Sequence, residues 1–142
     1  MSNEQLENFE ELGRRAVACK MWRWMPGMLA VHHQDYGNNG LDGRVIEIDD
    51  KEGPMWIGWG DLYLPLFEGS WPDLRDPATV GCLLYRVRDV WPAATTNWAN
   101  FLDEDRKIVS RWAVHKGLGH DAGLYLYSTE AAALVAALEG AP

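Results

Sequence analysis

The sequence predicts an α+β fold in which helices pack on an antiparallel sheet, roughly in the order α-β-β-β-β-α-β-β-α. Apolar residues recur at helical spacing in three separate segments, whereas leucines alternate strictly with other residues in Leu62–Phe67. Clusters of glycine, proline, asparagine and aspartate bound the short apolar segments between them. A length of 142 residues suits one domain, so we assign residues 1–142 to a single α+β domain.

Two helices carry clear start signals. Ser2–Lys20 begins with a capping box, in which Ser2 and Gln5 would satisfy backbone donors reciprocally. Asp76–Trp91 has an N-cap aspartate followed by a proline, whose missing N–H costs nothing at the first helical position. The apolar stripe that this second helix should bury comprises Val80, Leu83, Leu84 and Val87.

The last helix is expected to be capped by Ser128 and to end at Gly140. It has no polar side chain between Glu130 and Glu139, and a helix that is apolar all round is normally covered on more than one side. Either the first helix of the same chain or a second copy would supply the extra cover. We favour a homodimer through this C-terminal helix.

Strands are expected in the remaining apolar segments, which are Met28–Gln34, Arg44–Ile48, Met55–Trp59 and Leu62–Phe67. Pro65 places the fourth at a sheet edge, because proline cannot donate to a ladder. The segment Asn97–Lys116 fits either a helix or strands, and we favour a strand over Lys107–His115. The loop "KGLGHDAG" would then lead to a return strand over Leu124–Tyr127.

The net charge of −8 disfavours nucleic acid and anionic membranes as partners, because both require a basic surface. The acidic N-terminus lacks the apolar stretch of a signal peptide, and the longest apolar run, Ala131–Leu138, is too short to span a bilayer. We therefore expect a cytoplasmic protein in which Cys19 and Cys82 are reduced.

Eight tryptophans make this residue type the outlier of the composition. In "KMWRWMPGM", Trp22 and Trp24 would lie on one side of an extended segment and could form a stacking platform, with Arg23 on the other side. The alternative, which we favour, is that both indoles cap the core and Arg23 faces outward. In "MWIGWGD", Trp56 and Trp59 would face opposite sides of a strand. These five residues are the candidates for binding a ligand or partner.

A metal site is the alternative chemistry. His115, His120 and Asp121 flank the loop "HKGLGHD", where two imidazoles and a carboxylate could converge on zinc. Their spacing matches no strong metal motif, and no nucleotide-binding or triad signature occurs. We therefore expect no cofactor and favour a protein that is not an enzyme.

Three stretches are similar to small uncharacterised proteins encoded by tailed bacteriophages and prophages: "LGRRAVACKMWRWMPGM", "PDLRDPATVGCLLYRVRDVW" and "TEAAALVAALEGAP". The resemblance implies a phage-type setting inside a bacterial cell and assigns no catalytic residue. Our leading hypothesis is a non-enzymatic phage accessory or anti-defence factor that binds a host protein or a small ligand. The alternatives are a small metal-dependent hydrolase and a minor virion or assembly protein.

Overall fold

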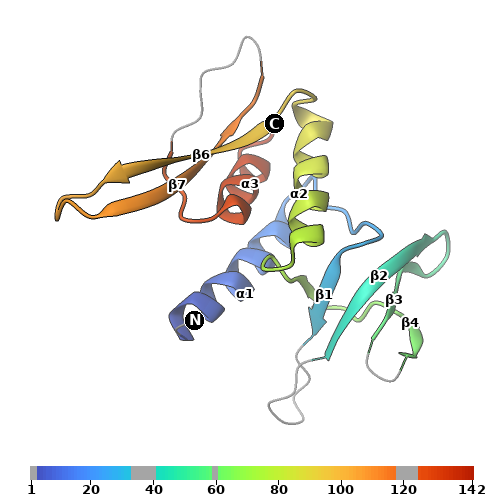
Figure 1. The fold of residues 1–142 in the computed structure, drawn as a ribbon. Coiled ribbons are helices and arrows are strands. Elements are labelled where there is room, and N and C mark those ends of the chain that lie inside the picture. Colours follow the sequence, from blue (N-terminus) through green and yellow to red (C-terminus); the bar gives the residue numbers. More distant parts are fainter. Residues whose placement is uncertain (1–2, 33–40, 59–60, 118–124) are drawn as a thin grey trace. The chain divides into compact units, whose positions relative to one another are not determined.

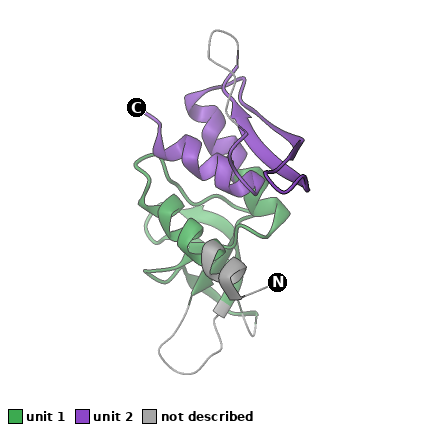
Figure 2. Ribbon diagram, turned by 90° about the vertical axis from the view of Figure 1, so that its left-hand side faces the viewer, with its two compact units in different colours: residues 1–82 green, residues 83–142 purple. Residues whose placement is uncertain are grey.

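The computed structural model describes residues 3–32, 41–58, 61–117 and 125–142. Within these residues the fold is mixed α+β, with three helices, a five-stranded antiparallel sheet and a separate hairpin, which confirms the predicted fold class (Figure 1). The chain divides into two compact units, residues 1–82 and residues 83–142 (Figure 2). None of the described helices is long and apolar enough to cross a membrane.

The described part of the first unit holds a complete helix, the first residues of a second helix and the five-stranded sheet, whose strand order is β4-β3-β2-β1-β5. Its elements are α1 (Asn3–Ala18), β1 (Leu29–His32), β2 (Leu41–Asp49), β3 (Gly53–Ile57), β4 (Tyr63–Pro65) and β5 (Trp71–Pro72). The proline-containing strand β4 lies at a sheet edge, as predicted. β5 was not predicted, because two residues are too few to show any periodicity.

Close backbone approach joins α1 to β5. A Cβ atom on Gly13 would lie 2.7 Å from the carbonyl oxygen of Pro72 and 2.8 Å from the indole of Trp71. Next to it, the guanidinium of Arg14 stacks 4.5 Å from the centre of the Trp71 ring, a cation–π contact. Glycine at position 13 therefore sets how near the helix lies to the strand.

The core of the sheet forms around three buried residues, Ala30, Val45 and Trp56. The partly buried side chains that pack against them are Trp24, Leu64, Leu66 and Phe67. Trp56 meets Phe67 edge to face, with ring centroids 5.5 Å apart. A Cβ atom on Gly43 would lie 2.7 Å from the Trp56 ring, so glycine leaves the space that the indole occupies.

The helix α2 (Pro77–Val90) runs across the division between the two units. Asp76 caps it as predicted, since its carboxylate accepts the Thr79 N–H at 2.9 Å. The predicted stripe is only half right: Leu83 and Val87 are fully buried, whereas Val80 and Leu84 are partly exposed.

The second unit contains the rest of α2, a hairpin and α3 (Glu130–Glu139). The hairpin strand β7 (Ile108–His115) matches the strand predicted over Lys107–His115. Its partner is β6 (Thr95–Leu102), which lies largely in the segment whose sequence fits either a helix or strands. The expected return strand over Leu124–Tyr127 is wrong in the part that is described, which is a single bridge from Tyr127 to Trp112.

The tract "DEDRK" closes the hairpin because its first residue organises a turn. The carboxylate of Asp103 accepts the N–H groups of Asp105 and Lys107 at 2.9 and 2.8 Å. Arg106 adopts a left-handed conformation with φ of 59°, which turns the chain back. These local bonds explain why the strands pair here.

The N-cap of α3 is Thr129 rather than Ser128, since the Thr129 hydroxyl accepts the Ala132 N–H at 3.1 Å. The buried residues of this helix are Ala131, Ala133, Leu134, Val135, Ala137 and Leu138. Only Ala132 and Ala136 among its alanines stay partly exposed. A second copy would therefore find a small contact surface on α3, and the homodimer through this helix remains a prediction.

Candidate functional site

The predicted tryptophan platform lies at the edge of the core of the first unit. Trp22 and Trp24 touch edge to face, with centroids 5.3 Å apart and ring planes at 83°. Both are partly buried, and Trp24 packs against the cluster around Trp56. Arg23 is exposed, as expected. Perpendicular, partly covered rings present little open face for stacking, so this geometry favours the core-edge alternative.

The other two binding candidates differ in what the structure shows. Trp56 is only 2% exposed and belongs to the core of the sheet, so its ring offers no surface to a partner. Trp59 lies outside the described residues.

The alternative metal cluster is described at one of its three residues. His115 is partly buried, and its Nδ1 accepts the N–H of Gly117 at 3.2 Å, so this ring nitrogen is already engaged within the protein. His120 and Asp121 lie outside the described residues. Within the described part of the chain, no three His, Cys, Asp or Glu side chains lie close enough to hold a metal ion.

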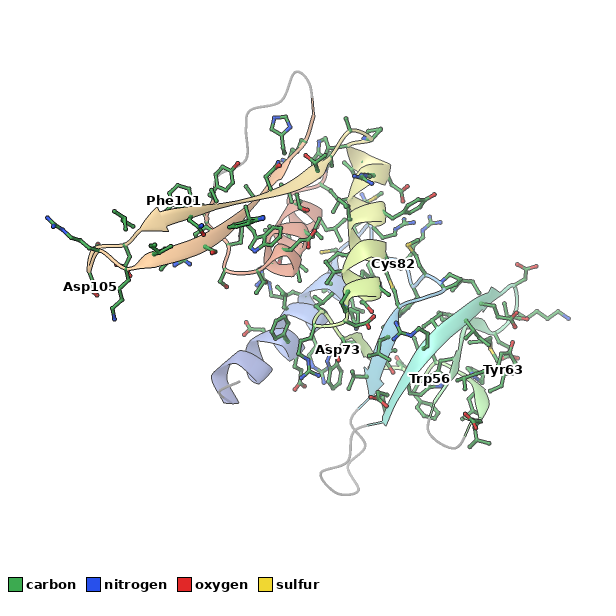
Figure 3. All side chains as sticks on the ribbon, viewed as in Figure 1. Trp56, Tyr63, Asp73, Cys82, Phe101 and Asp105 are labelled. Atoms are coloured by element: carbon green, nitrogen blue, oxygen red, sulfur yellow. The ribbon has the colours of Figure 1, made fainter. Side chains whose placement is uncertain are left out.

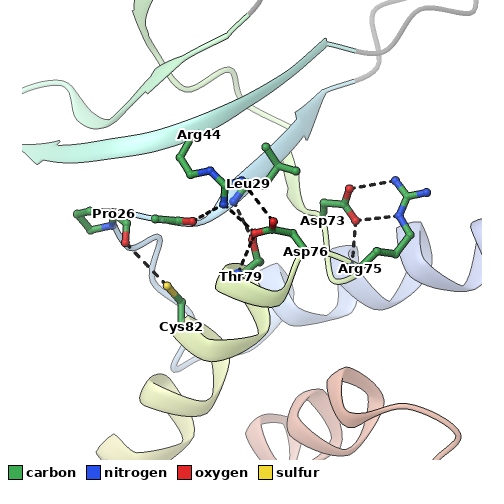
Figure 4. Close-up of polar contacts among 9 residues, drawn as sticks. Pro26, Leu29, Arg44, Asp73, Arg75, Asp76, Thr79 and Cys82 are labelled. Atoms are coloured by element: carbon green, nitrogen blue, oxygen red, sulfur yellow. Dashed lines mark hydrogen bonds and ion pairs between the residues drawn. The ribbon is translucent and has the colours of Figure 1, made fainter.

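A polar cluster of short hydrogen bonds joins the start of α2 to the sheet (Figure 4). Arg44 on β2 donates to the Asp76 carboxylate at 2.7 Å and to the Gly27 carbonyl at 2.8 Å. The hydroxyl of Thr79 donates to the same carboxylate at 2.7 Å and accepts the Leu29 N–H at 2.8 Å. Every member is already bonded within the protein, so the cluster is structural rather than a ligand site.

This cluster makes stability sensitive to acid. The hydrogen bond from Arg44, followed by those from Thr79, holds the pKa of Asp76 below its ordinary value of 3.8. A carboxylate with a lowered pKa in the folded state stabilises the protein above its unfolded-state pKa, and this contribution is lost as the pH falls through the folded-state pKa.

We therefore expect Asp76→Asn to be less stable than the wild type at pH 7 and to lose less stability below about pH 4. Denaturant unfolding at neutral and acidic pH measures both differences. Asp50→Asn, at an exposed turn aspartate, is the matched control and should follow the wild type. Parallel pH profiles for wild type and Asp76→Asn would contradict the expectation.

The hairpin carries the clearest exposed apolar surface in the second unit. Directly opposed residues share one face of an antiparallel pair, and the register pairs Trp98 with Trp112 and Leu102 with Ile108. On this face, Trp98 is 57% exposed, Leu102 68% and Ile108 74%. We call these three residues the hairpin patch.

Neighbouring contacts hold the patch in place. Between its two ends, the Ser110 hydroxyl donates to the Asn100 side-chain oxygen at 2.8 Å across the strands. Nearer the start of β6, the Thr96 hydroxyl donates to the Glu130 carboxylate of α3 at 2.6 Å. On the opposite face, Phe101, labelled in Figure 3, lies against the ring of Tyr125 with centroids 5.7 Å apart. The patch is thus a fixed surface built on paired strands.

Sequence reasoning missed this surface. Trp98, Phe101 and Leu102 lie at i, i+3 and i+4, which is helical spacing, so the alternation of Trp98, Asn100 and Leu102 was not recognised as a strand. The turn signal of "DEDRK" is the local feature that points to the hairpin.

No protein-family model, curated protein or solved structure matches this chain. The candidate surface therefore has to be judged by its own geometry.

Proposed function

We propose that this chain is a non-enzymatic binding protein that recognises another protein through the hairpin patch. The observation that carries the proposal is the exposure of Trp98, Leu102 and Ile108, between 57% and 74%, on one face of a hydrogen-bonded hairpin. Exposed apolar side chains that share one face mark protein contact sites, because covering them recovers hydrophobic free energy. In this patch the bonded pair Asn100 and Ser110 lies between Trp98 and the other two apolar side chains. Tryptophan is also among the residues most enriched at the energetic centre of such contacts.

The shape and charge of the patch favour a protein over other partners. Small molecules bind in concave pockets that cover most of their surface, whereas this patch lies on the face of a two-stranded ribbon. A nucleic-acid ligand would need cations on that face, and the chain as a whole carries a charge of −8. A protein surface with apolar side chains is the partner that fits.

The setting of this function follows from the resemblance to phage and prophage proteins. In that setting the partner is a host protein in the bacterial cytoplasm, and the chain acts as an accessory or anti-defence factor.

A photo-crosslinking amino acid placed at position 98 would identify the partner in bacterial cells. The complex is then rebuilt from purified proteins, and its Kd is compared between the wild type and a Leu102→Ser, Ile108→Ser double variant. We expect the double variant to weaken binding by at least about tenfold, because it removes two apolar anchors.

The matched control is an Ile46→Ser, Ile48→Ser double variant, which removes two aliphatic side chains that are 42% and 48% exposed on β2 of the first unit. Its Kd should stay within about twofold of the wild type. An equal loss in both double variants, or no loss in either, would contradict binding through the hairpin patch.

A further inference from the structure

The edge strands of the two sheets differ in length and in proline content. The five-stranded sheet ends on one side in β4, three residues long with Pro65, and on the other in β5, two residues long with Pro72. Short edge strands with proline are the usual protection against pairing with another chain. β6, in contrast, has eight residues, Thr95–Leu102, with neither a proline nor a charged side chain.

The outer edge of β6 presents a regular row of main-chain donors and acceptors. The N–H and C=O of Trp112 bond to Tyr127 at 2.7 and 3.3 Å, so they point away from β6. In an antiparallel pair, two directly opposed residues either both direct their main-chain N–H and C=O toward the other strand or both direct them away from it. Trp98 opposes Trp112, so the N–H and C=O of Trp98 point away from β7. The same orientation recurs at every second residue, which adds Thr96, Asn100 and Leu102. Within the described part of the chain, β7 is the only strand beside β6.

Opposite charges flank the two ends of this strand. Near its start, Arg88 donates to the carbonyl of Ala94 at 2.8 Å, and Lys116 lies 4.3 Å from the centre of the Trp91 ring. The turn after its end begins with three acidic residues, Asp103, Glu104 and Asp105 (the last is labelled in Figure 3), before the basic pair that precedes β7. Glu130, bonded to Thr96, and the basic pair Arg106 and Lys107 reduce the net charge at the two ends. An antiparallel copy would still bring its acidic turn to the Arg88 end, so the opposite charges that matter here are Arg88 and Glu104.

We propose that β6 pairs antiparallel with β6 of a second copy, so that two hairpins form one four-stranded sheet. The outward main-chain groups of Trp98 and its neighbours make the ladder, and each acidic turn faces the Arg88 end of the other copy. A two-fold axis perpendicular to the sheet lies between the two copies of β6, at the level of Trp98 or Ala99, and keeps both hairpin patches on the same face. The pairing goes beyond the proposed function, because it uses the edge of the strand rather than its face.

The main-chain part of this proposal is tested with a proline. Asn100→Pro removes an outward N–H that β7 does not use, so the hairpin should survive while pairing between copies is lost. Asn100→Ala is the matched control: it also loses the side-chain bond to Ser110 but keeps the N–H.

Sedimentation equilibrium from about 1 μM to about 500 μM, against a chain mass of 16.0 kDa, measures the association, and circular dichroism verifies that each variant is folded. We expect wild type and Asn100→Ala to dimerise, and folded Asn100→Pro to dimerise at least about tenfold more weakly. If Asn100→Pro unfolds, the charge exchange below decides the question.

The charge part is tested by reversal and rescue. Arg88→Glu and Glu104→Arg should each weaken the dimer, and the variant carrying both should recover most of the lost affinity, because the two charges then meet again with exchanged signs. If the wild type stays monomeric over the whole concentration range, the proposed pairing is overturned. A segment of another protein would then be the candidate to pair with the outer edge of β6.

A dimer with the wild-type Kd in all of these variants would also overturn the proposal. If that dimer dissociates in Ala136→Glu instead, the second copy binds on α3, where Ala136 is partly exposed.

Discussion

Replacing Trp56 by alanine should destabilise the protein by about 3–5 kcal/mol, the usual cost of truncating a fully buried tryptophan. The side chain is 2% exposed, forms the centre of the sheet core with Val45 and meets Phe67 edge to face. Its removal leaves a cavity between β2, β3 and the segment after β4. The free energy of unfolding, measured with denaturant and followed by circular dichroism, gives the loss.

Trp98→Ala is the matched control for this experiment. It deletes the same atoms from a side chain that is 57% exposed, so the change should stay within about 0.5 kcal/mol. Similar losses for the two variants would mean that Trp98 is covered in the isolated protein, and the hairpin patch would then not be available to a partner.

Leu134→Ala should cost the second unit about 2–5 kcal/mol. Leu134 has no exposed surface and lies at the middle of α3, which packs on the hairpin. The cost should reach the upper part of this range if the neighbouring alanines, which have no rotatable side-chain bonds, cannot move into the space.

Leu102→Ala is the corresponding control, because this leucine is 68% exposed at the end of β6. It should leave the unfolding free energy nearly unchanged. Hydrogen exchange of the β6 and β7 amides locates the effect: Leu134→Ala should speed exchange in the hairpin, since α3 covers part of it. A change confined to the first unit would contradict the packing described for α3.

The elements with local signals were predictable. The start of α2 has both its aspartate cap and its proline within two residues, and the edge position of β4 follows from Pro65 alone. The hairpin was harder, because apolar residues in Trp98–Leu102 satisfy a helical and an extended pattern equally well. Only the bonds of the Asp103 turn and the pairing across the strands decide between them.

Whether each tryptophan is buried or exposed could not be predicted from the sequence, for a different reason. Trp56 and Trp98 both lie on strands, yet one is buried and the other projects from a surface. The difference depends on what other segments place beside them, such as Phe67 against Trp56. The bond between Arg44 and Asp76 likewise joins residues 32 positions apart, a separation that no local pattern reports.

The close contacts of Gly43 restrict which residues can occupy positions 43 and 56, and they restrict position 43 more strongly. A Cβ atom there would meet the Trp56 ring and the main-chain oxygen of Ile57, each at 2.7 Å. Exchanging Trp56 for a smaller residue would relieve the first contact but not the second, because the second belongs to the backbone. Position 56 can therefore vary at a graded cost in stability, whereas position 43 accepts no side chain unless β2 and β3 themselves move apart. During evolution of this sheet, we therefore expect substitutions at position 56 to be tolerated more often than substitutions at position 43.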